Sequence, residues 1–314
     1  MGQLGFGIGI PQGSAGAGSD PDALRRFLRR AEELTYESAW VLEQPIGTAP
    51  TLDPVNLLAF AAAVTDRLRL GTAVILTPLR TPVGLAKALA TVDRLSAGRL
   101  IAGLGLGGQP ELYPAFGLAA EGRARRFEEA VGLIVKLWTE ASVTFQGEFW
   151  QLENVSVSPA PLQQPRPPVW FGGGAPSALR RAARMADGWI GAGSTDTTEL
   201  AGAVRTLHEE LDAGGRDRAG FALAKRVYMA VDEDVARARD SLATWFGHFY
   251  GDAELAARVA VAGPVDACIE GLARVVEAGA ELIVVNPIAD HEKQAQILAE
   301  EVVPHLIGRQ EGGA

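Results

Sequence analysis

The segment from Pro168 to Gly193 carries the pattern best suited to chemistry in this chain of 314 residues. Its sequence is PVWFGGGAPSALRRAARMADGWIGAG. The pattern predicts a strand at Val169–Phe171, a turn of three glycines, a helix at Pro176–Met185 and a second strand at Gly188–Gly193. Glycines between a strand and a helix let the backbone turn tightly and come close to a ligand.

A turn of this kind can hold an anion. The first amides of a helix have no partner within the helix, and the helix dipole places positive charge beside them. Together with the glycine turn they predict a site for an anion, most often a phosphate. An ordinary connection between a strand and a helix can contain the same glycines, so the neighbouring elements must decide between the two.

Apolar strands and amphipathic helices alternate along nearly the whole chain. Eight β/α units in this length favour a (β/α)8 TIM barrel, with a doubly wound sheet as the alternative. In such a barrel the functional site lies at the carboxyl ends of the strands. The eight predicted strands are Leu4–Ile10, Ala39–Glu43, Arg69–Thr77, Leu100–Gly107, Val169–Phe171, Gly188–Gly193, Phe221–Val231 and Leu282–Asn286.

The helices follow the same rhythm. One helix is predicted to start at Asp20. Four more are predicted at Pro54–Thr65, Pro82–Leu95, Arg123–Trp138 and Asp290–His305. Extra helices are expected between strands seven and eight, at Val235–His248, Ala253–Val261 and Val265–Ala278.

One stretch interrupts the alternation. Residues Val143–Pro159 predict a hairpin that turns at Gln146-Gly147, and a connector rich in Pro and Gln follows it. Because β/α units resume at once, we interpret residues 143–168 as an insertion within one domain of residues 1–314. Residues 309–314 are expected to be a frayed tail.

Composition excludes several classes of protein. The net charge of −9 argues against nonspecific nucleic-acid binding, which needs a basic face. The sequence contains no run of 18 apolar residues, so no membrane span is predicted. The first residues, MGQLGFGIGI, lack the basic region of a signal peptide. The single cysteine, Cys268, excludes an internal disulfide and a multi-cysteine metal site, so no metal is expected and a cytoplasmic location is favoured.

Several of these segments together resemble the luciferase-like monooxygenase family, whose members are TIM barrels that use reduced FMN or the deazaflavin coenzyme F420. The resemblance covers nearly the whole chain. It is carried by Leu52–Gly108, which includes LATVDRLSAGRL, by the R-x-x-R-F-E-E run at Arg123–Glu129, by the FQGEFW hairpin at Phe145–Trp150 and by Phe171–Trp189.

The resemblance implies a cofactor bed at the strand ends. It implies a non-proline cis peptide at Ala73–Val74 that supports the ring, with Thr77 near the same ring. Gly105 and Gly107 would pass beneath the cofactor. The amides of Gly173, Gly174 and Ala175 would bind its phosphate, with Gly193 and Ser194 nearby.

The residue for proton transfer is less clear, because the acids and histidines that many F420 enzymes carry are absent. The positions after strands two and four hold Gln44, Gly108 and Gln109 instead. Glu43, an acid at a strand end, is the best catalytic candidate. An ion pair with an arginine is the equal alternative.

Other side chains have a structural alternative as well. His248 could reach the mouth of the site, and Lys225 could anchor a substrate or extend to solvent. Plausible lining residues, most of which could equally be core, are Phe6, Trp40, Phe116, Trp245, Phe246 and Phe249.

Four functions remain open at this point. The first is a coenzyme F420-dependent oxidoreductase that transfers hydride between the deazaflavin and a small organic substrate. The second is an FMN-dependent monooxygenase supplied by a separate reductase. The third is a noncatalytic flavin-binding paralogue. The fourth is an aldolase-type barrel with Lys225 as a Schiff-base lysine. A homodimer is expected from the family.

Overall fold

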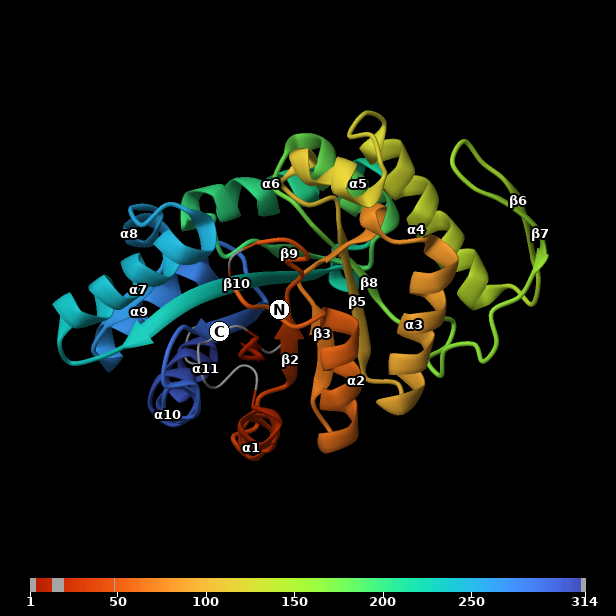
Figure 1. Cartoon of the computed structure of the whole chain (residues 1–314). Helices are drawn as coiled ribbons and strands as arrows, with labels where there is room; N and C mark the ends of the chain where they lie inside the picture. Colours follow the sequence, from red (N-terminus) through yellow and green to blue (C-terminus); the bar gives the residue numbers. More distant parts are fainter. Residues whose placement is uncertain (1–3, 13–19, 48, 312–314) are drawn as a thin grey trace.

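A computed structural model describes residues 4–12, 20–47 and 49–311, the side chains of 309–311 excepted. Eight parallel strand positions form a closed ring, because β10 pairs with both β9 and β12. The TIM-barrel prediction is therefore confirmed over the doubly wound alternative (Figure 1). The strands of the ring are β1 (Gly5–Gly9), β2 (Ser38–Val41), β3 (Arg69–Thr72), β4 (Ile75–Leu76), β5 (Leu100–Gly105), β8 (Val169–Gly172), β9 (Gly188–Gly191), β10 (Ala222–Val231) and β12 (Leu282–Pro287).

Helices cover the outside of the ring. Most bury an apolar face against the strands, as the amphipathic pattern predicts. The helices are α1 (Pro21–Glu33), α2 (Pro54–Val64), α3 (Pro82–Leu95), α4 (Arg123–Thr139), α5 (Pro176–Met185), α6 (Thr197–Ala213), α7 (Val235–Tyr250), α8 (Leu255–Val259), α9 (Val265–Glu277), α10 (His291–Ile297) and α11 (Val303–Glu311). Of these, α8 packs on α7 and α11 packs on α9. No helix in the described part of the chain is both long and apolar enough to cross a membrane.

The hairpin insertion predicted from the sequence is present, and so are helices between the last two strands of the ring, which are α7, α8 and α9. The antiparallel hairpin of β6 (Val143–Gln146) and β7 (Gln151–Val155) projects beyond α4 at the right of Figure 1. The carboxylate of Glu129 on α4 accepts hydrogen bonds from the amides of Glu148, Phe149 and Trp150, which fixes the hairpin turn to the helix.

Several predicted boundaries differ from the structure, and the second and fourth predicted strands end two residues early, at Val41 and Gly105. The third strand divides into β3 and β4, with a cis peptide at Ala73–Val74 between them, and Thr77 begins the short 3-10 helix η1 (Thr77–Leu79). The sixth strand ends at Gly191. The segment after α8 is the strand β11 (Val261–Gly263), paired with β10.

The last difference is at the carboxyl end. After α10 the chain passes through a π-helical turn at Leu298–Val302, and α11 then continues to Glu311, beyond the predicted end at His305. Residues 312–314 of the expected frayed tail lie outside the described residues.

The interior of the barrel is filled by two indoles. Trp40 on β2 and Trp170 on β8 approach to 5.3 Å between ring centroids. Trp40 has space because Gly71 faces it: a Cβ at Gly71 would lie 2.3 Å from the indole. The indole N–H of Trp40 donates to Ser38 Oγ at 2.8 Å, so its polar atom is satisfied inside the core.

The amino ends of the strands are tied together by the D-R-L-S-A-G-R run at residues 93–99. Asp93 is fully buried, and its carboxylate accepts hydrogen bonds from the amides of Leu162 (2.6 Å) and Gln163 (3.0 Å). The Gln163 side chain donates to the same carboxylate at 2.7 Å. Arg99 donates to the backbone carbonyls of Ala62, Thr65, Leu68 and Ser96. This conspicuous sequence run therefore stabilises the fold at the end away from the carboxyl rim.

Replacing Asp93 with Ala should destabilise the fold strongly. The substitution removes the acceptor of three part-buried hydrogen bonds and leaves the amides of Leu162 and Gln163 without it, so we expect the free energy of unfolding to fall by about 3 kcal/mol. Urea denaturation of Asp93→Ala and of Glu140→Ala, an exposed carboxylate just after α4, provides the measurement and its control. Equal stability of the two variants would contradict the structural role of Asp93.

Candidate functional site

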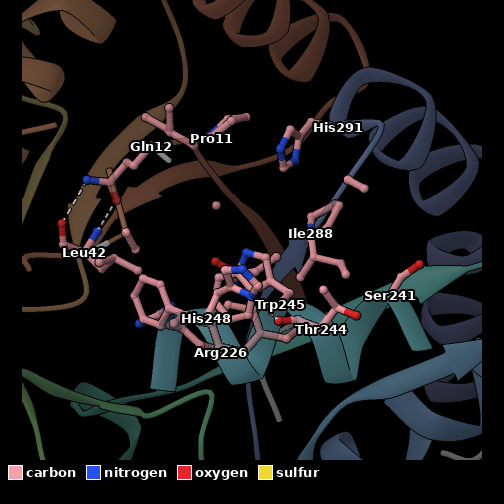
Figure 2. A pocket seen from close by; sticks show the side chains of 18 of the residues that line it. Pro11, Gln12, Leu42, Arg226, Ser241, Thr244, Trp245, His248, Ile288 and His291 are labelled. Carbon is pink, nitrogen blue, oxygen red and sulfur yellow. Dashed lines mark hydrogen bonds between the residues drawn. The ribbon is translucent and has the colours of Figure 1, made fainter. Parts of the chain in front are cut away.

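A cavity of about 950 Å³ opens at the carboxyl ends of β10, β12, β1 and β2. Figure 2 shows side chains from these strand ends facing others from α7 across it. From the strand ends come Ile10, Pro11, Gln12, Trp40, Leu42, Ala73, Arg226, Tyr228, Asn286 and Ile288. From α7 and the residue before it come Asp234, Ala236, Arg237, Asp240, Ser241, Thr244, Trp245, His248 and Phe249, and His291 begins α10.

Gln12 joins the two loops that form one side of the cavity. Its side-chain amide donates to the carbonyls of Leu42 (2.9 Å) and Leu52 (3.1 Å), and its oxygen accepts from the Leu42 amide at 2.6 Å. All of these contacts are to backbone, so Gln12 fixes the shape of the wall.

Helix α7 supplies an aromatic wall. The rings of Trp245 and Phe249 stack at 4.6 Å with an interplanar angle of 12°, and Tyr228 lies 4.5 Å from Trp245. Trp245 and Phe249 thus line the cavity, as the sequence suggested they could. Phe6 and Phe246 are core residues instead, and Phe116 is exposed and away from the cavity.

Two histidines reach the cavity. His248, which the sequence placed as a possible neighbour of the mouth, lines it and has Nδ1 3.0 Å from the Thr244 carbonyl, so Nδ1–H is the donor. His291, which the sequence analysis did not single out, also lines the cavity. Burial lowers the pKa of His291, with the Pro287 carbonyl and Asp290 acting in the opposite direction.

Strand β10 brings two adjacent cations to the floor of the barrel mouth. Arg226 is 8% exposed, lines the cavity, donates to the Ala73 carbonyl at 3.0 Å and donates to the Tyr228 hydroxyl. Lys225 points away from the cavity, and its ammonium donates to the carbonyls of Ala192 and Thr195 and to the Thr195 hydroxyl. Lys225 therefore anchors the loop after β9 and does not extend to solvent.

Glu43 is engaged in an ion pair, the alternative that the sequence left open. Arg80 donates to its carboxylate through Nε at 2.9 Å and through Nη2, and the Leu76 amide donates to its other oxygen. Arg80 also binds Asp53 at 2.6 Å. Glu43 does not line the cavity, and neither does Thr77, which is fully buried in η1.

The glycines singled out in the sequence lie on the other half of the rim, over β5, β8 and β9. A Cβ at Gly105 would lie 2.5 Å from Val74, and one at Gly172 would lie 3.0 Å from the same side chain. The cis peptide thus joins the two halves: Ala73 lines the cavity, whereas Val74 packs between two glycine strand ends.

The glycine turn itself is open. Gly173 has φ +110°, a conformation that favours glycine, and a Cβ at Gly174 would meet nothing within 4 Å. Helix α5 begins at Pro176 with no side chain capping its first amides. The turn is fixed from behind, because the Trp189 indole donates to the Gly173 carbonyl at 2.9 Å.

Gly193 and Ser194 lie in the next loop. Gly193 packs against Tyr228, where a Cβ would lie only 2.4 Å from the ring. Ser194 neighbours the hydroxyl of Tyr250.

Arg123 is a candidate that the sequence analysis missed. It opens α4 one turn before Phe127, whose ring lies 4.9 Å from Phe171 at the end of β8. The charge of Arg123 acts on Tyr113, whose hydroxyl donates to the Leu106 carbonyl just after β5, and the Nη1 of Arg123 is buried with no hydrogen-bond partner in the described structure. The R-x-x-R-F-E-E run that begins at Arg123 was the available signal.

Within residues 4–12, 20–47 and 49–311, no group of three His, Cys, Asp or Glu side chains is arranged to hold a metal ion.

Comparison with known proteins shows relatives of this architecture. The family model described as luciferase-like monooxygenase matches residues 5–282. An F420-dependent glucose-6-phosphate dehydrogenase of Kineococcus radiotolerans is 34% identical over 238 residues, which is 72% of this chain and 68% of that protein.

Two solved structures share the fold. An F420-dependent secondary alcohol dehydrogenase, in complex with an F420-acetone adduct, superposes with a TM-score of 0.84 at 20% identity, covering 97% of this chain and 99% of that one. The oxygenating constituent of 3,6-diketocamphane monooxygenase of Pseudomonas putida, in complex with FMN, gives 0.77 at 18% identity, covering 96% and 98%. Together with the family match and the barrel geometry, these findings identify the chain as an oxidoreductase of the luciferase-like monooxygenase family.

Proposed function

We propose that this enzyme is a coenzyme F420-dependent oxidoreductase that transfers hydride between the deazaflavin and a small organic substrate. The observation that carries the choice of cofactor is the 34% identity to an F420-dependent glucose-6-phosphate dehydrogenase. The FMN-bound monooxygenase is similar only in fold. It supports the alternative, an FMN-dependent monooxygenase that receives reduced flavin from a separate reductase.

The rim of the barrel fits such a cofactor. The open glycine turn leaves amides free for a phosphate, and the orphaned Arg123 guanidinium would add a positive charge beside them. We propose that Gly173, Gly174, Ala175 and Arg123 hold the phosphate.

The ring would lie between the two halves of the rim. Gly105 and Gly107 present no side chains there, and Ala73–Val74 provides its support. Gly193 and Ser194 would flank it from the loop that Lys225 fixes. When bound, coenzyme F420 supplies hydride exchange at C5 of its ring.

The chain's own side chains would position the substrate. The aromatic wall of α7 excludes water from the cavity, and His248 and His291 offer ring nitrogens for proton exchange at its mouth. We leave Glu43 and Thr77 out of this proposal, because Arg80 holds the carboxylate of Glu43 and Thr77 presents no surface to a ligand.

The two remaining functions are a noncatalytic paralogue and a Schiff-base aldolase, and each predicts a different experimental result. A noncatalytic flavin-binding paralogue would bind the cofactor without turnover. A Schiff-base role of Lys225 is disfavoured, because its amine points away from the cavity and is hydrogen-bonded to backbone. A homodimer and a cytoplasmic location remain predictions.

Titration with coenzyme F420 and with FMN tests the choice of cofactor. We expect the fluorescence of oxidised coenzyme F420 to change on binding at low micromolar concentration or below, with much weaker binding of FMN. Tight binding of FMN without any response to coenzyme F420 would overturn the proposal in favour of the monooxygenase. Binding of neither would favour the paralogue.

Substitution of Gly174 tests the phosphate site. Space around Gly174 is open and its φ is not in the left-handed region, so Asp fits without a clash. Its charge would repel the phosphate, and we expect Gly174→Asp to weaken cofactor binding at least about tenfold. Gly174→Asn, similar in shape and neutral, should bind nearly as the wild type does. Equal affinity of the Asp variant and the wild type would place the phosphate elsewhere.

The anchoring role of Lys225 predicts a pH dependence of stability. Burial, with a smaller contribution from the charge of Arg226, lowers the pKa of Lys225 from 10.5 to about 7. Between these pH values the unfolded chain binds more protons than the folded one, so the free energy of unfolding rises with pH. Lys225→Met lacks this contribution.

We therefore expect the stability of the wild type relative to Lys225→Met to increase from pH 7 to about pH 9.5, measured by urea denaturation. The matched control is Lys136→Met, an exposed lysine on α4. A stability difference that stays constant over this range would show that Lys225 keeps an ordinary pKa.

A further inference from the structure

The floor of the cavity carries a guanidinium that is in no ion pair with any described residue, although the carboxylates of Asp234 and Asp240 line other parts of the same cavity. The guanidinium of Arg226 is 8% exposed, and its hydrogen bonds go to two neutral acceptors, the Ala73 carbonyl and the Tyr228 hydroxyl. A guanidinium has more N–H donors than these two acceptors use, and it stays charged at every physiological pH.

The surroundings make this charge more costly. Lys225 is the adjacent residue on β10, and the carbonyls that its ammonium contacts carry no net charge. Burial and the charge of Arg226 lower the pKa of Lys225, and the charges of Glu199 and Asp196 act on it in the opposite direction. A buried charge without a counter-ion is unfavourable, so an anion that entered the cavity would be stabilised beside Arg226.

The apolar lining of the cavity indicates what kind of group the rest of the ligand carries. Trp245 and Phe249 stack and present a flat aromatic wall. Ile288 adds an apolar side chain to the lining (Figure 2). A planar guanidinium fork matches a carboxylate, which it can bind through two parallel hydrogen bonds.

We propose that the substrate carries a carboxylate, bound by Arg226, on an apolar or aromatic body that packs against Trp245 and Phe249. This inference rests on the proposed function, because it takes the cavity to be the substrate site of an oxidoreductase. The phosphate of the cofactor is assigned to a different part of the rim, at the glycine turn over β8. Arg226 is therefore available for the substrate.

The test uses the full chain without cofactor, with benzoate and neutral benzamide as probes of the same size. We expect the wild type to bind benzoate at least about tenfold more tightly than benzamide by isothermal titration calorimetry. Benzoate should also raise the thermal unfolding midpoint. Equal affinities, or no binding of benzoate, would overturn the proposal, and so would a preference for phenyl phosphate, which would point to a phosphate group instead.

Variants assign the effect to Arg226. Arg226→Met should abolish the preference for benzoate, whereas Arg226→Lys, which keeps the charge but loses the fork, should retain part of it. Arg218→Met removes an exposed arginine that pairs with Asp212 and should bind benzoate as the wild type does. A preference that survives in Arg226→Met would show that another group binds the anion.

The same variants separate this inference from the proposed function. If the wild type binds benzoate but not coenzyme F420, the proposed function fails and the carboxylate site stands. If Arg226→Met loses affinity for coenzyme F420 and the wild type does not bind benzoate, the charge of Arg226 serves the cofactor. The substrate assignment is then wrong.

Discussion

Closure of the parallel barrel is the constraint on which the rest of the structure depends. Hydrogen bonding between β9 and β10 completes a ring in which every strand runs in the same direction, so all the carboxyl ends meet at one rim. Residues far apart in the sequence become neighbours there, as Gln12 and Leu42 do, or Arg226 and Ala73. The opposite end is closed by Asp93 and Arg99, which stabilise the fold and take no part in the site.

The rim has two chemically different halves. Over β5, β8 and β9 it presents glycines and free amides, where a backbone can approach a phosphate and a flat ring. Over β10, β12, β1 and β2 it presents a cavity with aromatic, imidazole, guanidinium and carboxylate side chains. The break in the third strand lies between them, with Ala73 on the cavity and Val74 against the glycines. A cofactor on one half and a substrate on the other would meet at this break.

The sequence was sufficient for the fold, because eight apolar strands and amphipathic helices repeat with a regular period. It also indicated the glycine half of the rim, since glycines between a strand and a helix are a local signal. The cavity half could not be predicted in the same way. Arg226 and His291 are ordinary residues until the ring closes, and whether they face a cavity depends on contacts with distant segments. Glu43 illustrates the converse: its position at a strand end suggested catalysis, but Arg80 on another loop holds it in an ion pair.

The division of the rim into a cofactor half and a substrate half is tested most directly by a crystal structure of the protein with coenzyme F420 bound. We expect the phosphate within hydrogen-bonding distance of the Gly174 and Ala175 amides, and the ring against Ala73–Val74 with Arg226 still free at its edge. A phosphate bound at Arg226, or a ring that fills the space in front of Trp245 and Phe249, would contradict this division.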